Sequence, residues 1–590
     1  MDELILDILK QLRDGSQGAL DTHQLEMLIN SHNSGIDSSA HSTEREKLIP
    51  KRAILPYFLQ VKQKNDELWQ SWNVTPELEE RFIRSVRMKP RRTASGVATI
   101  TVITRPHTCS SNCIYCPCDL RMPKSYLANE PACQRAELTF FDPYVQVAAR
   151  LQALHQMGHS TDKVELIVLG GTWSDYPESY QYWFIKELFR ALNEWPNSPS
   201  HIQERLNWYT SFGLQNSEEA LSSFVAEQQA AVFDDTATYN QAFHKLYDTS
   251  QPHQSAWSQM QSTYDELVEQ QHVNETAAAR VVGLVIETRP DTITPDNLRM
   301  FRQLGCTKIQ IGIQSTRQEI LDANQRQMNV AQIKRAFSLI RLYGFKIHSH
   351  LMVNLLGATP EADKRDFKTF VTDPGFLPDE IKLYPCALVS GTQLVQKYRE
   401  GAWQPYAKDE LVDVLVQDVL ATPPYVRISR MIRDISATDI LVGNKHTNLR
   451  QMVEQELAAK DVASRVQEIR FREINQQQVR AAELTLQDFT YTTAVSDEHF
   501  LQWVTADNKI AGFCRLSLPH WDKLTAGACD VTANELLVQP GQAMIRELHV
   551  YGQALSLGSE GMSAQHQGLG QKLLAKASSI AADAGYTSLN

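Results

Sequence analysis

Three cysteines on one short loop are the residues whose types and spacing most directly suggest chemistry. Cys109, Cys113 and Cys116 form a C-x3-C-x2-C pattern just after a β-branched run, 97–104. Three thiolates can hold three irons of a four-iron cluster, which leaves one iron open to a small molecule. The spacing alone also allows a redox pair, a loop without metal, or a zinc site completed by His107, Cys118 or Cys133.

A second candidate site lies near the C-terminus. A short strand pattern around Glu547–Val550 precedes Gln565-His-Gln-Gly-Leu-Gly570, which opens a helical pattern. Glycines let a backbone approach a ligand closely, and the free N–H groups of a first helical turn face an anion. The pattern therefore indicates either a phosphate-binding turn or a helix start whose small residues serve packing.

Basic residues gather beside the cysteine loop although the chain is acidic. The net charge of −11 argues against a protein that coats nucleic acid non-specifically. Between Arg81 and Pro106, however, seven Lys and Arg residues occur without any Asp or Glu. This run is either a solvated face or a contact for a phosphate-bearing substrate. A second basic candidate is formed by Arg427, Arg430 and Arg433, which would share a face on a helix and spread apart in an extended segment.

Bulk composition narrows the class of protein. At 590 residues the chain exceeds a single core, so several domains are expected. Its nine cysteines are odd in number and partly clustered, which favours a reducing, cytoplasmic location over a disulfide framework. No apolar run approaches the length of a membrane span, and the N-terminus is an acidic amphipathic helix rather than a signal peptide.

Alternating strand and helix patterns must position the cysteine loop. Strands are expected at 97–104, 164–169, 281–287, 308–313, 345–355 and 381–384, with helices at 143–157, 179–195, 295–304, 330–343 and 362–371. Such βα units predict an α/β fold with a partial parallel (β/α)6 barrel, whose chemistry lies at the C-terminal strand ends. The expected domains are a helical region 1–80, the barrel 81–400 with a helical surface insertion at about 196–279, a helical linker 401–482 and a mixed α+β domain 483–590. We assign no chemistry to the insertion.

The motifs together resemble one family. They are 89–96, 115–117, 162–165, 170–172, 287–290, 312–315, 382–385, 546–552 and 565–570. In combination they resemble the catalytic subunit of Elongator and its single-chain counterparts, the tRNA uridine(34) acetyltransferases. That resemblance implies a radical-SAM barrel followed by a GNAT-like acetyltransferase domain. It is not shared with biotin-synthase-like or methylthiotransferase-like enzymes.

The resemblance implies carboxymethylation of C5 of the tRNA wobble uridine, with a [4Fe-4S] cluster, S-adenosylmethionine and acetyl-CoA. A radical from S-adenosylmethionine would take hydrogen from the acetyl methyl group, and the carbon radical would add to C5 before thioester hydrolysis. Carried over by position, the cluster falls to Cys109, Cys113 and Cys116, and S-adenosylmethionine to Gly170 and Gly171. Acetyl-CoA falls to Lys163, Glu547, Leu548, His549, Val550, Leu569, Gly570 and Gln571, and tRNA to Lys89, Arg91 and Arg92.

The implied partners are the anticodon arm of tRNA, an electron donor of unknown identity, and either a second copy or Elongator-like subunits. Two departures from the family pattern stand out. Cys118 is an additional candidate ligand, and the chain stops at 585–590, before strands that a GNAT domain needs, so an incomplete second domain is expected. The competing hypotheses are a protein lysine acetyltransferase, which leaves the cysteines unexplained, and a truncated tRNA-binding scaffold with impaired turnover.

Overall fold

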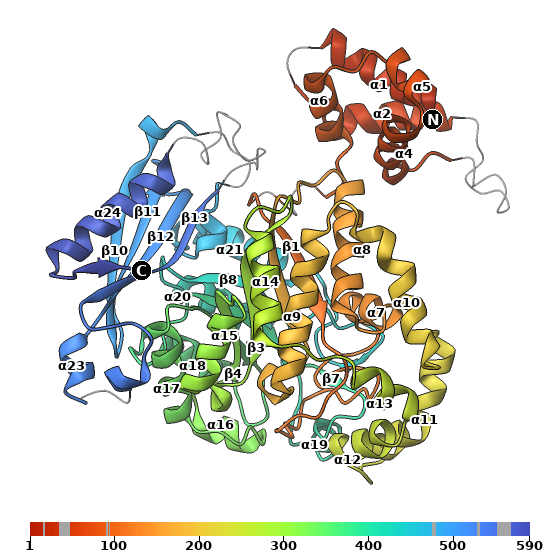
Figure 1. Cartoon of the computed structure of the whole chain (residues 1–590). Helices are drawn as coiled ribbons and strands as arrows, with labels where there is room; N and C mark the ends of the chain where they lie inside the picture. The colour runs from red at the N-terminus through yellow and green to blue at the C-terminus, as the bar shows by residue number, and fades with distance from the viewer. Residues whose placement is uncertain are drawn as a thin grey trace.

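The computed structural model describes residues 1–15, 18–34, 48–89, 93, 95–474, 479–527, 531–551 and 568–590. Figure 1 shows a small group of helices at the N-terminal end, a central sheet with its helices, and a second sheet at the C-terminal end. The N-terminal helices are α1 (Asp2–Asp14), α2 (Thr22–Asn33), α4 (Lys51–Lys64), α5 (Asp66–Ser71) and α6 (Pro76–Val86). They enclose an apolar core of their own, which includes Leu9, Phe58 and Phe82.

The central sheet is parallel and open, as the sequence predicts for a partial barrel. Its strand order is β1-β2-β3-β4-β5-β6-β8, so β1 and β8 are its edges. The strands are β1 (Ala98–Ile103), β2 (Lys163–Leu169), β3 (Arg280–Thr288), β4 (Lys308–Gln314), β5 (Lys346–Val353), β6 (Glu380–Pro385) and β8 (Arg427–Arg430). All six expected strands are present, with bounds that differ by a few residues at most.

Strand β8 was not predicted, and it corrects both the sixfold count and the description of 401–482 as a helical linker, a region that also contains β9 (Ile440–Val442). β8 pairs with β6 in parallel, with Arg427 opposite Glu380 and Ile428 opposite Ile381. A four-residue Arg-Ile-Ser-Arg strand carries too little alternation to be recognised, because only Ile428 faces the apolar side. The same region does contain two helices, α20 (Lys408–Ala421) and α21 (Leu449–Ala459).

Strand alternation separates an apolar outer face from a polar interior. In β4, Ile309, Ile311 and Ile313 belong to the core beneath the helices, whereas Lys308 and Gln310 line the interior. Successive side chains of a strand point to opposite faces, so each strand supplies both surfaces. The covering helices are α8 (Pro143–Gln156), α9 (Glu178–Asn193), α15 (Pro295–Gln303), α17 (Val330–Leu342) and α18 (Pro360–Thr372). The barrel therefore encloses a polar space suited to a ligand.

The predicted insertion is helical. It contains α10 (Ile202–Ser211), α11 (Glu218–Phe233), α12 (Tyr239–Phe243), η4 (His244–Asp248), α13 (Gln251–Trp257) and α14 (Tyr264–Asn274). Figure 1 shows α11, α12 and α13 together beside the barrel. Helix α12 contacts the cysteine loop directly, because the side chain of Asn240 bonds the backbone of Cys109.

The C-terminal part is a mixed α+β unit. Strands β10 (Thr485–Thr492), β11 (Ser496–Val504), β12 (Ile510–Pro519) and β13 (Gln542–Val550) are antiparallel, and β14 (Ser588–Leu589) joins β13 in parallel. Helix α24 (Leu569–Asp583) packs on this sheet, while α23 (Trp521–Thr525) follows β12. β14 pairs with Gln542 and Ala543 of β13, and Asn590 continues this ladder, since its carbonyl accepts from the N–H of Ile545. No helix in the described ranges combines the length and apolar character needed to cross a membrane.

Candidate functional site

The cysteine loop, residues 109–116, lies at the carboxyl end of the parallel strands. Cys109 Sγ is 3.7 Å from Thr172 Oγ1, in the loop that follows β2. Cys113 Sγ accepts hydrogen bonds from Arg326 Nη1 at 3.2 Å and from Ser111 Oγ at 3.2 Å. All three thiols are free and line one cavity of about 1710 Å³. The structure therefore gathers the predicted cluster ligands around a single space.

The environment of the thiols suits a cluster ligand set. Burial opposes ionisation of Cys113, but Arg326, Ser111 and Arg289 together lower its pKa to about 7. Burial raises the pKa of Cys116 to about 12, although Lys124 opposes this. A bound metal deprotonates a coordinating thiol outright, so Cys116 would ionise on binding.

Zinc fits these residues less well. Among the described residues, no group of three Cys, His, Asp or Glu side chains converges as the ligands of a single ion would. A cluster places each thiolate on a different iron, so its ligands stand further apart than those of one zinc. The extra ligands that zinc would need, His107, Cys118 and Cys133, do not line the cavity.

The two glycines assigned to S-adenosylmethionine have different positions. Gly170 has φ +146°, and a Cβ there would lie 1.7 Å from Thr104 Oγ1. Gly171 has φ +82°, lines the cavity and would bring a Cβ within 3.3 Å of the Lys124 carbonyl. Gly170 thus permits close packing of the ends of β1 and β2, and Gly171 alone faces the ligand space.

The residues assigned to acetyl-CoA border the opposite end of the same cavity. Lys163, the first residue of β2, lines the cavity together with Glu547, Leu548, His549 and Val550. His549 Nε2 is buried without a hydrogen-bond partner among the described residues.

The first turn of α24 adjoins this strand. A Cβ on Gly570 would lie 3.7 Å from Val550 and 3.8 Å from Leu548. Leu569 is buried and its carbonyl accepts from Trp503, whereas Gln571 is exposed and does not line the cavity. Residues 565–567 of the glycine-rich turn lie outside the described residues.

The residues assigned to tRNA are only partly placed. Lys89 is exposed on the connection between α6 and β1, and Arg91 and Arg92 lie outside the described residues. The basic run is not one continuous surface, because Arg105 is buried with its guanidinium 4.0 Å from the Trp257 ring centre. The second basic candidate does lie at the candidate site, because Arg427, Arg430 and Arg433 line the cavity.

A row of polar side chains inside the barrel escaped the sequence analysis. This interior polar chain consists of Tyr126, Glu287, His350, Gln310 and Lys382. Tyr126 Oη donates to Glu287 at 2.5 Å, and His350 Nδ1 lies 3.5 Å from the same carboxylate. His350 Nε2 and Lys382 Nζ approach Gln310 Oε1 at 3.1 and 2.6 Å. The missed signal was polar residues at every second position of otherwise apolar strands.

Burial shifts the pKa values of two members of the interior polar chain, His350 and Lys382. It lowers the pKa of His350 well below its usual value, with Lys382 contributing, so the imidazole is neutral near neutral pH. Burial also lowers the pKa of Lys382 to about 8; Glu287 opposes this, while Arg430 and other cations reinforce it. The barrel centre thus holds a neutral imidazole beside a lysine that titrates in the working range of an enzyme.

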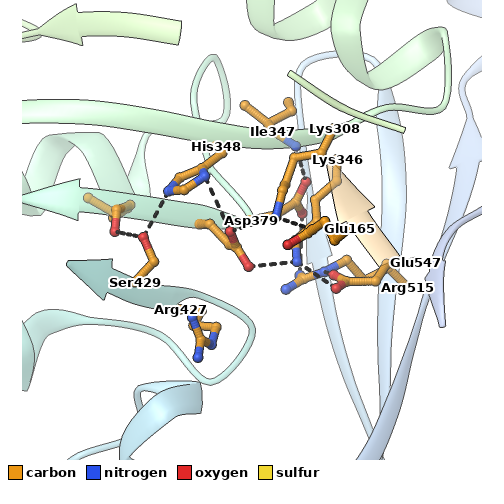
Figure 2. A network of polar contacts seen from close by, with 12 residues as sticks. Glu165, Lys308, Lys346, Ile347, His348, Asp379, Arg427, Ser429, Arg515 and Glu547 are labelled. Atoms are coloured by element: carbon orange, nitrogen blue, oxygen red, sulfur yellow. Dashed lines mark hydrogen bonds and ion pairs between the residues drawn. The ribbon is translucent and has the colours of Figure 1, made fainter. Parts of the chain in front are cut away.

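Buried charges join the barrel to the C-terminal sheet. Figure 2 shows part of this interdomain ion network, and Lys346 Nζ lies 2.7 Å from Glu380 and 2.5 Å from Glu547. Its further members are Glu165, Lys308, Asp379, Glu498, Arg515 and Arg546. The carboxylate of Glu547 therefore belongs to the domain contact.

Comparison with known proteins identifies the family. Residues 255–368 match the model of the radical SAM superfamily, and residues 378–459 match that of the Radical_SAM C-terminal domain. The chain is 35% identical over 499 residues to a tRNA uridine(34) acetyltransferase of Dehalococcoides mccartyi, covering 84% of this chain and 92% of that protein. The chain belongs to the tRNA uridine(34) acetyltransferase family.

Other members of the family are similar to this chain over most of its length. The tRNA uridine(34) acetyltransferase of Methanocaldococcus infernus is 31% identical, covering 86% of this chain and 83% of its own. Human Elongator complex protein 3 is 28% identical, with coverage of 86% and 82%. A solved structure of the archaeal Elp3 from M. infernus superposes with a TM-score of 0.60 at 28% identity, covering 83% of this chain and 91% of that one. The resemblance drawn from the motifs is confirmed.

Proposed function

We propose that this protein attaches a carboxymethyl group to C5 of the tRNA wobble uridine, with acetyl-CoA as the acyl donor. The observation that carries the proposal is one cavity that borders both the cysteine loop and the strand Glu547–Val550 of the C-terminal sheet. A radical site and an acyl-donor site that share one space can act on the same molecule. Relatives named tRNA uridine(34) acetyltransferase supply the substrate class.

The C-terminal sheet is proposed to be a GNAT-like acyl-CoA domain. The first turn of α24 packs beside Leu548 and Val550 of β13. Free N–H groups at that helix start suit a pyrophosphate. The two ends of the cavity are separated by about the length of a barrel strand such as β4, which spans about 20 Å at ~3.3 Å per residue. An extended pantetheine arm is long enough to carry a thioester over that distance toward the cysteine loop.

The protein's own groups hold and orient the reactants. Cys109, Cys113 and Cys116 would hold the cluster, and the backbone at Gly171 would border S-adenosylmethionine. When bound, these two cofactors supply a radical able to act on an unactivated C–H bond. Arg430, the last residue of the edge strand β8, and Arg433 line the cavity and are proposed to contact phosphates of the anticodon arm.

Lys382 is proposed to donate a hydrogen bond to the thioester carbonyl. Replacement by methionine is expected to lower turnover about 100-fold, since removal of one preorganised donor typically has this effect. Because the pKa of Lys382 is about 8, the wild-type rate should fall as the pH rises through that value. The Lys382→Arg variant stays charged and should keep its rate at high pH. A full-speed methionine variant, or a flat wild-type profile across this range, would refute this role.

The proposed activity is tested with the full chain, reconstituted anaerobically with iron and sulfide. We expect 5′-deoxyadenosine and 5-carboxymethyluridine only when reductant, S-adenosylmethionine, acetyl-CoA and tRNA are all present, as measured by mass spectrometry. Aerobic acetylation of protein lysines by iron-free protein would instead support a lysine acetyltransferase. Binding of tRNA without any 5′-deoxyadenosine would support a scaffold.

A further inference from the structure

The helical insertion contacts the cysteine loop through an asparagine on α12. Asn240 Oδ1 accepts from the backbone N–H of Cys109 at 3.1 Å. Its Nδ2 donates to the carbonyl of the same residue at 2.8 Å. One carboxamide thus satisfies both backbone groups of Cys109, as a neighbouring β-strand would.

A second carboxamide does the same for the segment that follows the loop. Gln229 Oε1, on α11, accepts from the N–H of Leu120 at 2.8 Å, and Nε2 donates to the carbonyl of Cys118 at 2.8 Å. We call Asn240 and Gln229 the carboxamide clamp. Two buried tyrosines add to it, since Tyr239 and Tyr247 donate to the carbonyls of Met122 and Leu120, both at 2.8 Å.

These contacts matter because residues 109–122 form no helix or strand. Backbone groups in such a segment find few partners of their own, and buried polar groups need them. The barrel supplies some on the other side, where Ile114 N–H donates to the Asn324 carbonyl at 3.3 Å and Ser110 N–H to Asp175 at 3.0 Å. The segment therefore lies between the barrel and the insertion and is held by both.

We propose that Asn240 is a positioning residue for the iron–sulfur cluster. By fixing the backbone of Cys109, it orients that thiolate toward the cavity shared with Cys113 and Cys116, and Gln229 supports it from the next turn of the segment. The insertion thereby keeps the cluster bound. This inference rests on the cluster assignment of the proposed function and adds a role for a segment that carries no cluster ligand.

The test uses the full chain with three variants. Asn240→Ala removes both hydrogen bonds, and Asn240→Asp keeps the acceptor but loses the donor and adds a negative charge. Asn207→Ala is the matched control, because Asn207 lies on α10 of the same insertion and its side chain bonds only Gln203. The readouts are the rate of cluster loss to an iron chelator, the midpoint potential and electron paramagnetic resonance spectrum of the cluster, and amide hydrogen exchange at 109–122 in the iron-free protein.

We expect Asn240→Ala to lose the cluster about tenfold faster than wild type, the ratio that corresponds to about 1.4 kcal/mol. Exchange at Cys109 should accelerate even without iron. Asn240→Asp should shift the midpoint potential to more negative values, because it adds negative charge near the cluster, and Asn207→Ala should match wild type in every readout. If cluster loss, potential and exchange in both Asn240 variants equal those of wild type, the positioning role is wrong. A wild-type protein that binds no iron would overturn the cluster assignment and this inference with it.

Discussion

Replacing Cys113 with serine is expected to remove the cluster and to lower uridine modification by more than about 1000-fold, as loss of an essential catalytic group does. The Cys113 thiolate is stabilised by Arg326 at 3.2 Å and faces the cavity. A serine hydroxyl ionises far less readily than this thiol, so it cannot supply the anionic ligand that iron needs. Iron and sulfide content, the visible absorbance of the cluster and 5′-deoxyadenosine formation should all fall together.

Cys118→Ser is the matched control. Cys118 is two residues from Cys116, yet it does not line the cavity, and its Sγ donates to the Cys116 carbonyl at 3.2 Å. Serine can make the same hydrogen bond, so this variant should keep the cluster and full activity. A Cys118 variant without iron, together with a Cys113 variant that retains it, would mean that the ligand set is wrong.

The barrel could be predicted from sequence because the pattern that marks each of the six predicted strands lies within one short stretch of residues. β2 reads Lys-Val-Glu-Leu-Ile-Val-Leu and ends at Gly170 and Gly171, so strand, turn and the position of the ligand edge are all encoded within one stretch. The cysteine loop follows the same logic, since spacing and the preceding strand fix its place. β8 carries no such local signal, and its pairing with β6 joins residues 47 or 48 positions apart in the chain.

The interior polar chain and the carboxamide clamp could not be predicted for a related reason. Gln310, His350 and Lys382 stand on three different strands, and only the parallel register brings them together. Asn240 is one asparagine in a polar, helical segment, and nothing in its neighbours indicates a partner 131 residues away. Such contacts arise from tertiary packing, which a single sequence reports only through residue types.

Charges at strand starts were used only in part, since Lys163 was assigned to acetyl-CoA and Arg427 to a basic group, whereas Lys308, Lys346 and Glu380 were given no role. Lys163, Lys308, Lys346, Glu380 and Arg427 begin β2, β4, β5, β6 and β8. At the end of a sheet such residues are usually solvated, so their types alone do not indicate a buried network. In the structure the C-terminal sheet covers this end, and most of these charges join the interdomain ion network shown in Figure 2.

Asp379→Asn is expected to lower the free energy of unfolding by about 3–5 kcal/mol, the typical result of removing one partner of a buried ion pair. Asp379 and Arg546 are both fully buried, with contacts of 2.6 and 2.8 Å. Arg515 Nη1 also lies 3.3 Å from this carboxylate. Asparagine would leave two buried guanidinium groups without their shared anion. Urea unfolding followed by tryptophan fluorescence measures the loss, and Asp413→Asn, in a partly exposed pair with Lys364, should cost less than about 1 kcal/mol.

The stability difference between wild type and Asp379→Asn is expected to depend on pH. Burial opposes ionisation of Asp379, but Arg546 and Arg515 hold its pKa well below the usual range. Because the folded pKa is lower than the unfolded one, the contribution is complete above the unfolded value of about 3.9 and is lost as the pH falls further. Wild type should therefore lose its advantage over Asp379→Asn on acidification. A difference that stays constant down to about pH 2, or a variant as stable as wild type at neutral pH, would show that this ion network does not hold the two domains together.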